Sequence, residues 1–443
     1  MTNQNNLMED IISLAKRRGF IFQSSEMYGG LGGFYDYGPL GVELKRKVES
    51  QWWKIFVEER EDVVGLASSI IMNPKVWEAS GHLEHFSDPL VECKKCHQRF
   101  RADQEAEIKE HQHQEFTEPR SFNTLFKTYV GPTEDDANVA YLRPETAQGM
   151  FVNFENVLNS TRATVPFGIA QIGKSFRNEI TYRNFIFRVR EFDIAEVEYF
   201  VKPGEDDQAF ADWLKFMERA LTEGFGLDKK KLKHFEHPKE KLAHYSKQTI
   251  DIMYQYPWGW DELWGLANRT DYDLKQHEKF SGQKLAYRDP KSGETYTPYV
   301  IEPTGGIDRL LLAILAESYS KVKGGRTTTT KATKDEEVVL KLPKNLAPFQ
   351  VAVLPLTKKE SVTKVARQIY DELRLKLAID YDEVASVGRR YRRQDEIGTP
   401  YCVTIDFDSL DDKQVTIRDR DTMKQDRIPI DNLADELTRR LAD

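Results

Sequence analysis

The chain has few cysteines and no long apolar run, and these two absences exclude several classes of protein. Only Cys93, Cys96 and Cys402 occur in 443 residues, so no disulfide framework supports the fold and a reducing compartment is expected. No apolar stretch approaches the roughly 18–20 residues that span a bilayer. The first twenty residues lack the layout of a secretory signal. We therefore expect a cytoplasmic protein that does not enter a membrane.

The common nucleotide-binding fingerprints are also missing. The chain has neither G-x-x-x-x-G-K-[ST] nor a G-x-G-x-x-G placed between a strand and a helix. The glycine-rich segment YGGLGGFYDYGPLG at 28–41 predicts a cluster of turns rather than a phosphate cradle. The formal net charge of -8 argues against a protein that coats nucleic acid indiscriminately. It leaves room for a local basic patch that binds one RNA.

Length and patterning predict an α+β protein with two main domains. Residues 1–320 contain charged strands and helices without regular alternation, which indicates a mainly antiparallel sheet. Residues 321–346 are expected to be a linker and a connecting strand, because 321–337 is polar and of low complexity. Residues 347–443 alternate strand and helix as a compact α/β module.

Helical spacing of apolar residues marks one helix near each end of the chain. The predicted buried stripes are Leu7, Ile11, Leu14 and Ala15 in the first helix, and Val362, Val365, Ile369 and Leu373 in the second.

Two strand-like segments, 169–179 and 193–200, alternate in character and predict an antiparallel pair joined by a basic loop. The polar residues expected to share a face are Gln171, Ser175, Arg177, Glu179, Glu196 and Glu198. One interpretation is a solvated outer face of a sheet. The other is a binding site, because the cations here are mostly arginine, and Phe185, Phe187 and Phe192 lie among them. Guanidinium, carboxylate and phenyl groups suit a triphosphate, an ammonium and a purine.

A third segment, TPYVIEPTGGIDRLLLAILAES, points the same way. It predicts a strand that ends at Glu302, a glycine-containing junction, and an apolar helix with Arg309 in its first turn. An arginine there opposes the helix dipole, so it is either a tolerated surface residue or a group that meets an anion. Glu262, between large apolar residues of WDELWG, is a further candidate.

These segments resemble the motifs of class II aminoacyl-tRNA synthetases. FRNEITYRNFIFRVREF is similar to motif 2, EPTGGIDR to motif 3, and IIMNPKVWEASGH to motif 1, with Pro74 as its proline. YGGLGGFYDYGPLG, FRAD, YLRPETAQGMF, ELWGLANRTDYDL and GRRYRRQDEIGTPYCVTID narrow the resemblance to the homodimeric glycyl-tRNA synthetase family. It covers nearly the whole chain, and it implies a catalytic domain at 1–320 with an insertion region at 80–140. It implies a homodimer that attaches glycine to tRNA(Gly) through glycyl-adenylate, with ATP as substrate and Mg²⁺.

The resemblance also implies the residues of the site. Arg177 and Arg309 would be catalytic, stabilising charge at phosphorus and at the γ-phosphate. The implied ATP-binding residues are Arg177, Asn178, Glu179, Phe187, Arg188, Val189, Arg190, Glu191, Phe192, Glu262, Leu263, Gly306, Ile307, Asp308 and Arg309, with Glu262 a candidate Mg²⁺ ligand. The implied glycine-binding residues are Arg101, Glu145, Phe192, Asp193, Ile194, Ala195, Glu196, Glu302, Pro303, Thr304, Gly305 and Gly306.

The C-terminal module would bind the anticodon. Its segment GRRYRRQDE at 388–396 sets arginines around a tyrosine, which suits RNA backbone contacts and base stacking, with a solvated basic turn as the alternative.

The chain departs from the family pattern at three places. Thr304 replaces the usual serine and crowds the pocket, and Tyr182 replaces a proline, which predicts a less rigid loop. The second C-x-x-C after FRAD is missing, so we expect no metal site and no zinc at the cysteine pair. The alternative is a zinc site completed by His97, His111 or His113.

Two other functions compete with glycylation. One is a class II synthetase of the prolyl, threonyl or seryl type, which RPETAQG and ELWGLANRTD disfavour. The other is a synthetase-like protein that binds tRNA without catalysis. It is disfavoured because Arg177, Glu179, Glu262 and Arg309 are all present.

Overall fold

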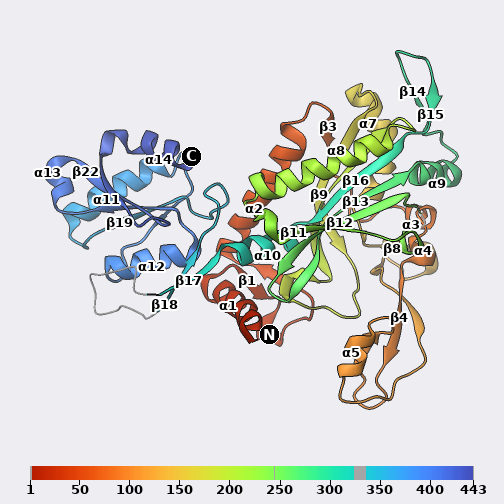
Figure 1. Ribbon diagram of the computed structural model, residues 1–443, viewed down its shortest axis with the longest axis horizontal. Helices are drawn as coiled ribbons and strands as arrows, with labels where there is room; N and C mark the ends of the chain where they lie inside the picture. Colours follow the sequence, from red (N-terminus) through yellow and green to blue (C-terminus); the bar gives the residue numbers. More distant parts are fainter. Residues whose placement is uncertain (1, 244, 324–335, 443) are drawn as a thin grey trace.

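A seven-stranded sheet forms the centre of the larger, N-terminal part of the molecule (Figure 1). The computed structural model describes residues 2–243, 245–323 and 336–442. Every neighbouring pair in the sheet is antiparallel except the last, where β3 runs parallel to β9. In order the strands are β11 (Leu232–Glu236), β12 (Gln248–Tyr256), β13 (Gly259–Thr270), β16 (Tyr299–Gly306), β10 (Glu191–Val201), β9 (Phe167–Phe176) and β3 (Val63–Gly65).

Helices cover one face of this sheet and form the main hydrophobic core with it. α10 is apolar almost all round, so it lies fully buried between the sheet and the helices outside it. Residues Ile11, Leu14 and Ala15 of the first helix are buried and Leu7 is half-buried, which confirms the predicted stripe. The covering helices are α1 (Thr2–Arg18), α2 (Pro39–Trp53), α8 (Asp206–Arg219) and α10 (Ile307–Ser318).

The opposite face is covered only in part. A second apolar cluster around Phe167, Phe200 and Val300 packs under short helices. These are α6 (Ala147–Phe151), α7 (Phe154–Thr161) and α9 (Tyr272–Ser281), with α3 (Pro74–Ala79) beside α9 and α4 (His82–His85) beside α3. Where these helices stop, the face carries charged and polar side chains.

Short strands and turns surround the main sheet. The glycine-rich segment at 28–41 holds turns, as predicted, although β2 and the start of α2 also lie within it. The small antiparallel pairs are β1 (Ile21–Gln23) with β2 (Tyr35–Tyr37), β7 (Lys127–Tyr129) with β8 (Val139–Tyr141), and β14 (Tyr287–Arg288) with β15 (Thr295–Tyr296).

Part of the predicted insertion forms a separate lobe that projects from the body (Figure 1, orange). It contains a three-stranded antiparallel sheet and one short helix. These are β4 (Ser87–Glu92), β5 (Arg99–Arg101), β6 (Arg120–Asn123) and α5 (Glu105–Glu110).

The C-terminal module is the α/β unit that the alternating pattern predicts. Its sheet has the order β20-β19-β21-β22-β23, parallel among the first three strands and antiparallel beyond them. In α11 the predicted stripe is confirmed, since Val362, Ile369 and Leu373 are buried and Val365 is half-buried. The elements are β19 (Val351–Pro355), α11 (Glu360–Leu373), β20 (Ile379–Tyr381), α12 (Val387–Ile397), β21 (Tyr401–Ile405), α13 (Asp408–Asp412), β22 (Gln414–Asp419), β23 (Gln425–Pro429) and α14 (Leu433–Ala442).

The segment predicted to be a linker is partly a strand pair. β17 (Tyr319–Lys323) is antiparallel to β18 (Glu336–Leu340), and residues 324–335 lie outside the described residues. The prediction of a loop is therefore wrong at both ends of 321–337. The reason is packing, because Leu340 and Leu342 extend the core of the N-terminal part.

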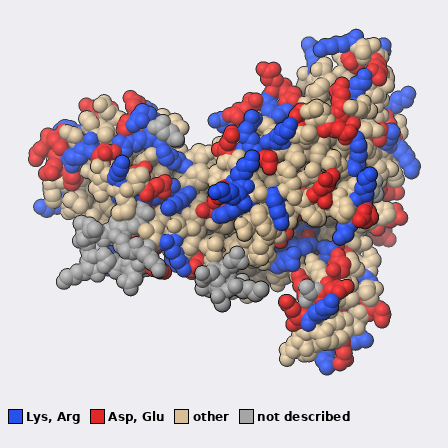
Figure 2. Space-filling model, viewed as in Figure 1, with Lys and Arg blue, Asp and Glu red and all other residues tan. Residues whose placement is uncertain are grey.

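Charges of both signs are interspersed over the face seen in Figure 2. This face therefore has no broad area of one sign (Figure 2). None of the helices in the described residues combines the length and apolar character that crossing a bilayer requires.

Candidate active site

Two adjoining cavities lie on the open face of the sheet, over β10, β13 and β16. We call the first the arginine cavity; it is lined by Arg177, Glu179, Ile186, Phe187, Arg188, Val189, Phe192, Ile194, Glu262, Thr304, Gly305, Gly306, Asp308 and Arg309. We call the second the carboxylate cavity; its lining includes Glu145, Glu196, His237, Tyr245, Thr249, Asp251, Gly265 and Glu302. Arg177, Ile194, Glu262 and Thr304 line both, so the two cavities meet there.

The alternation of β10 decides which of its residues reach the cavities. Phe192, Ile194 and Glu196 line them. Asp193 and Ala195 point to the other face, because neighbouring side chains in a strand alternate. Asp193 pairs there with Lys45 and with Lys174 at 3.1 Å, and Ala195 belongs to the core. The unbroken range Phe192–Glu196 implied by the resemblance is therefore too broad for side-chain contacts.

β16 supplies the floor of both cavities. The strand does not end at Glu302, as the sequence predicted, but runs to Gly306, and α10 begins at the next residue. Glu302 and Thr304 face the carboxylate cavity, while Gly305 and Gly306 face the arginine cavity. A Cβ at Gly305 would lie 2.1 Å from the ring of Trp264 on β13, so no side chain fits there.

Arg309 enters the arginine cavity from the first turn of α10. Its Nη1 lies 3.0 Å from Oε2 of Glu262, and its guanidinium stacks 4.5 Å above the ring of Phe187. Arg309 lowers the pKa of the Glu262 carboxyl, which burial would raise. Glu262 is therefore ionised, and its side chain is 43% exposed, so it can reach a cation in the cavity.

Arg177 stands where the two cavities meet. Its Nε donates to the carbonyl of Pro144 at 3.1 Å, and its guanidinium lies 5.5 Å from the rings of Phe86 and Phe192. These contacts fix the side chain while leaving it in the lining of both cavities. Nearby, Arg188 donates to Glu179 at 3.0 Å, so this pair also lies in the arginine cavity.

Several residues implied by the resemblance lie outside the cavity linings. Arg190 binds the carbonyls of Gly32 and Glu179, at 2.9 Å in each case, and so braces the glycine-rich segment. Arg101 pairs with Asp88 at 3.1 Å and with Asp103 at 2.7 Å. Glu191 pairs with Lys174, and the backbone N–H of Asn178 donates to the carbonyl of Thr124. Leu263 and Ile307 belong to the core, and Pro303 lines neither cavity.

Buried carboxyl groups dominate the carboxylate cavity. Glu196, Glu198 and Glu302 lie so close that one oxygen of each is within 4.8 Å of the others. Burial raises the pKa of the Glu302 carboxyl well above its usual range, although Arg269 opposes the shift, and burial likewise raises that of Glu196. The solvated outer face considered from the sequence is wrong, since Glu198 is fully buried.

Glu145 differs from these carboxyl groups. Burial alone would raise its pKa, but His82 and Arg269 lower it below the usual range, so Glu145 is ionised. His82 Nε2 lies 3.4 Å from Oε2 of Glu145, and Gln148 donates to Oε1 at 3.0 Å. The cavity therefore contains an ionised carboxylate, Glu145, beside two carboxyl groups, Glu196 and Glu302, whose pKa values are raised.

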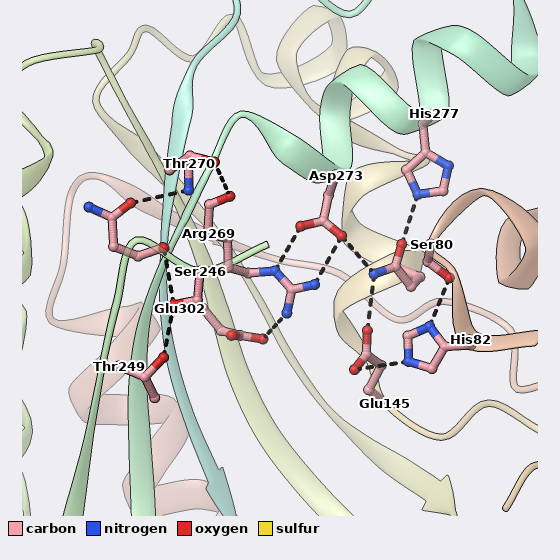
Figure 3. A network of polar contacts seen from close by, with 12 residues as sticks. Ser80, His82, Glu145, Ser246, Thr249, Arg269, Thr270, Asp273, His277 and Glu302 are labelled. Atoms are coloured by element: carbon pink, nitrogen blue, oxygen red, sulfur yellow. Dashed lines mark hydrogen bonds and ion pairs between the residues drawn. The ribbon is translucent and has the colours of Figure 1, made fainter. Parts of the chain in front are cut away.

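A network behind the cavity holds these groups in place (Figure 3). Arg269 donates to Asp273 at 2.8 and 2.9 Å and to Glu302 at 2.8 Å. Gln148 joins Asp273 to Glu145, and the ring of Tyr245 lies 4.0 Å from the Arg269 guanidinium. The network therefore connects α9, β13 and β16 and fixes the position of the Glu302 carboxylate.

Sequence reasoning missed several of these residues. Arg269 and Asp273 lie within ELWGLANRTDYDL and His82 within WEASGH, so the quoted segments contained them without singling them out. His237, which directly follows β11, and Asp251 of β12 are paired at 2.8 Å in the cavity wall, and the sequence alone does not reveal that β11 and β12 are neighbours.

The arginines of 388–396 form only in part the exposed surface that the sequence indicated, because their burial differs. They lie on α12, where Arg390 is buried and binds the carbonyls of Pro355 and Asp382. Tyr391 is also buried, and its hydroxyl contacts Thr404. Stacking of a base on Tyr391 is therefore excluded in this conformation, while Arg389 is exposed.

Comparison with known proteins matches two family models. Residues 126–318 match the tRNA synthetase class II core domain (G, H, P, S and T), and residues 350–440 match the anticodon binding domain. A glycine–tRNA ligase of Thermobifida fusca is 49% identical over the full length of both chains. Those of Caldanaerobacter subterraneus and Streptomyces coelicolor are 51% and 50% identical, each with 98% of both chains covered.

The chain belongs to the glycine–tRNA ligase family. The resemblance drawn from the sequence is thus confirmed, together with the α+β fold and the ligase activity on glycine and tRNA. The rival assignment to a prolyl, threonyl or seryl enzyme is not supported.

Proposed function

We propose that the two cavities form the adenylation site of this glycine–tRNA ligase. ATP lies in the arginine cavity and glycine lies in the carboxylate cavity. The observation that carries the proposal is the place of Arg177, which lines both cavities at their junction. The bond that adenylation forms joins one substrate to the other, so a cation is needed at that point.

In the arginine cavity, Arg309 and Arg188 supply positive charge for the phosphates, and Phe187 and Phe192 supply apolar surface for the adenine. The exposed, ionised Glu262 is a candidate ligand of the Mg²⁺ that accompanies ATP. Glu179, held by Arg188, is placed to accept from the adenine amino group. Arg190 and Arg101 would act indirectly, through the segments that they brace.

In the carboxylate cavity, Glu145, Glu196 and Glu302 surround the ammonium of glycine. Glycine has no side chain to grip, so selection depends on this charge complementarity and on a lack of room beside its Cα. The methyl of Thr304 points toward Gly265, since a Cβ built at Gly265 would lie 3.5 Å from Thr304 Cγ2. The extra methyl group that threonine has compared with serine therefore lies beside Gly265, which has no side chain to clash with it.

The reaction then needs no protein nucleophile. An oxygen of the glycine carboxylate attacks the α-phosphorus of ATP, and the bond to pyrophosphate breaks while Arg177 stabilises the developing charge. The terminal ribose hydroxyl of tRNA(Gly) next attacks the carbonyl carbon of glycyl-adenylate, and AMP leaves.

We also propose that residues 1–320 form the catalytic domain and residues 347–443 bind the anticodon of tRNA(Gly). The match of 350–440 to the anticodon binding domain supports the second assignment. A homodimer is implied by the resemblance alone, and light scattering would test it by giving twice the mass of the chain. A cytoplasmic location stays a prediction from the sequence.

Pyrophosphate exchange into ATP tests the adenylation site. We expect exchange with glycine and not with alanine, serine or proline. Arg177→Ala should abolish it, whereas Arg183→Ala, in the same loop but paired with Glu107 outside the cavities, should retain it. Exchange that survives Arg177→Ala would overturn the proposed site, and a folded protein without exchange for any amino acid would point to tRNA binding without catalysis.

A further inference from the structure

Two cysteines and two histidines gather in the projecting lobe, away from both cavities. Each of Cys93, Cys96, His111 and His113 offers one ligand atom, and these atoms all lie within 4.8 Å of one another. Sγ of Cys96 is 3.3 Å from Nε2 of His111. The two cysteines and the two histidines come from separate segments of the chain, so the fold of the lobe brings them together.

The C-x-x-C segment forms the turn between β4 and β5. The backbone N–H of Cys93 donates to Gln98 at 2.8 Å, and that of His97 donates back to Cys93 at 2.9 Å. This tight turn brings Cys93 and Cys96 together. His111 follows the last residue of α5, and Phe116 then pairs with Cys93, so the chain passes back over the cysteines.

The histidines show which of the three candidates from the sequence can join the pair. His97 is excluded, because its Nδ1 contacts Oε1 of Glu92 at 3.0 Å and its side chain is 75% exposed. His113 is different, since its Nδ1 is buried and has no hydrogen-bond partner. A buried polar nitrogen without a partner is costly, and a bound cation would satisfy it.

We propose that Cys93, Cys96, His111 and His113 bind one Zn²⁺ ion as a structural site. Zn²⁺ bound tetrahedrally, at about 2.3 Å from sulfur and about 2.0–2.1 Å from nitrogen, separates its ligand atoms by about 3.3–3.8 Å. The existing cluster needs only small side-chain adjustments to reach these distances. Two thiolates with two imidazoles favour zinc over the hard cations. This proposal replaces the expectation from the sequence that the pair binds no metal.

Four protein ligands leave no open position, so the ion would hold the lobe together rather than react. The lobe at 87–123 is small, and modules below about 40 residues usually need a metal, disulfides or a partner for stability. Its buried apolar residues are few, chiefly Leu90, Val91 and Phe100. The ion would tie the β4–β5 turn to the segment after α5.

The test measures metal content and coordination in the full-length protein. We expect one zinc per chain after purification and dialysis. After removal of zinc, added Co²⁺ should give the visible bands of tetrahedral cobalt with a thiolate charge-transfer band. Cys96→Ser and His113→Gln should each lose both signals. His97→Gln, in the same turn, and Cys402→Ser, in the C-terminal module, should keep them.

Circular dichroism would confirm that each variant is folded. If Cys96→Ser does not fold, His113→Gln still tests the proposal. The proposal is overturned if the folded wild-type chain binds less than one zinc and gives no tetrahedral cobalt spectrum. Loss of the site in His97→Gln but not in His113→Gln would overturn the ligand set. So would a Cys93–Cys96 disulfide that persists under reducing conditions in the presence of zinc.

Discussion

Replacement of Glu145 by glutamine separates charge from shape in the carboxylate cavity. Glu145 is ionised, because His82 and Arg269 lower its pKa against the effect of burial. Glutamine keeps the size and still accepts from Gln148, whose present bond is 3.0 Å long. The substitution therefore keeps the shape of the side chain and removes the negative charge that faces His82 and, in the proposed site, the ammonium of glycine.

The magnitude follows from the burial of the site. A hydrogen bond to a charged partner contributes about 1.5–3 kcal/mol, and each 1.4 kcal/mol is a factor of about ten. We therefore predict that Glu145→Gln raises the KM for glycine by about 10- to 150-fold in pyrophosphate exchange. The KM for ATP should stay close to that of the wild type, since Glu145 does not line the arginine cavity.

Glu198→Gln is the matched control. Burial raises the pKa of the Glu198 carboxyl well above its usual range, which favours the protonated, uncharged form, and glutamine resembles that form in charge and size. We expect a KM for glycine near that of the wild type. Equal losses in both variants would show that packing rather than charge is responsible. An unchanged KM in Glu145→Gln would refute the placement of the ammonium.

Three further predictions concern nucleotide binding, pH and stability. Arg309→Gln removes the ion pair with Glu262 at 3.0 Å and should raise the KM for ATP at least about tenfold, as an ATP titration would show, with little effect on glycine. Because burial raises the pKa of Glu302 and an ammonium binds only the ionised form, the KM for glycine should fall as pH rises, by up to about tenfold per pH unit; a flat pH profile would contradict this. Trp52→Ala, at a site 2% exposed, should cost about 3–5 kcal/mol of stability, seen as a lower thermal midpoint, whereas Leu375→Ala, 82% exposed, should leave the midpoint unchanged.

The strand pair of the site was accessible from the sequence because its signals are local. Alternation in 169–179 and 193–200 predicted β9 and β10, and their register pairs Glu196 with Gln171 as antiparallel neighbours. The same period of two explains why Asp193 and Ala195 should not have been expected in the cavity. Resemblance to a motif names a continuous segment, whereas a strand presents only every second side chain.

Other contacts could not be predicted because they depend on distant backbone. Arg190 lies among residues of the arginine cavity in the sequence, yet its guanidinium binds a carbonyl of Gly32, 158 residues away. A long side chain can reach either side of a loop, and only the position of the glycine-rich turn decides between them. Arg390 was similarly misjudged, since carbonyl groups of two other segments enclose it.

The floor that β16 gives to both cavities has a consequence for how specificity can change. In the proposed adenylation site, Glu302 lies under the amino acid and Gly305 and Gly306 lie under the nucleotide, a few residues apart on one extended backbone. Because a strand rises by about 3.3 Å per residue, the backbone of β16 fixes the distance between the two proposed substrate positions. We therefore expect a substitution at Glu302 to alter the choice of amino acid without moving ATP. Thr304 is the residue of β16 that lines both cavities, so a single substitution there should change the binding of both substrates.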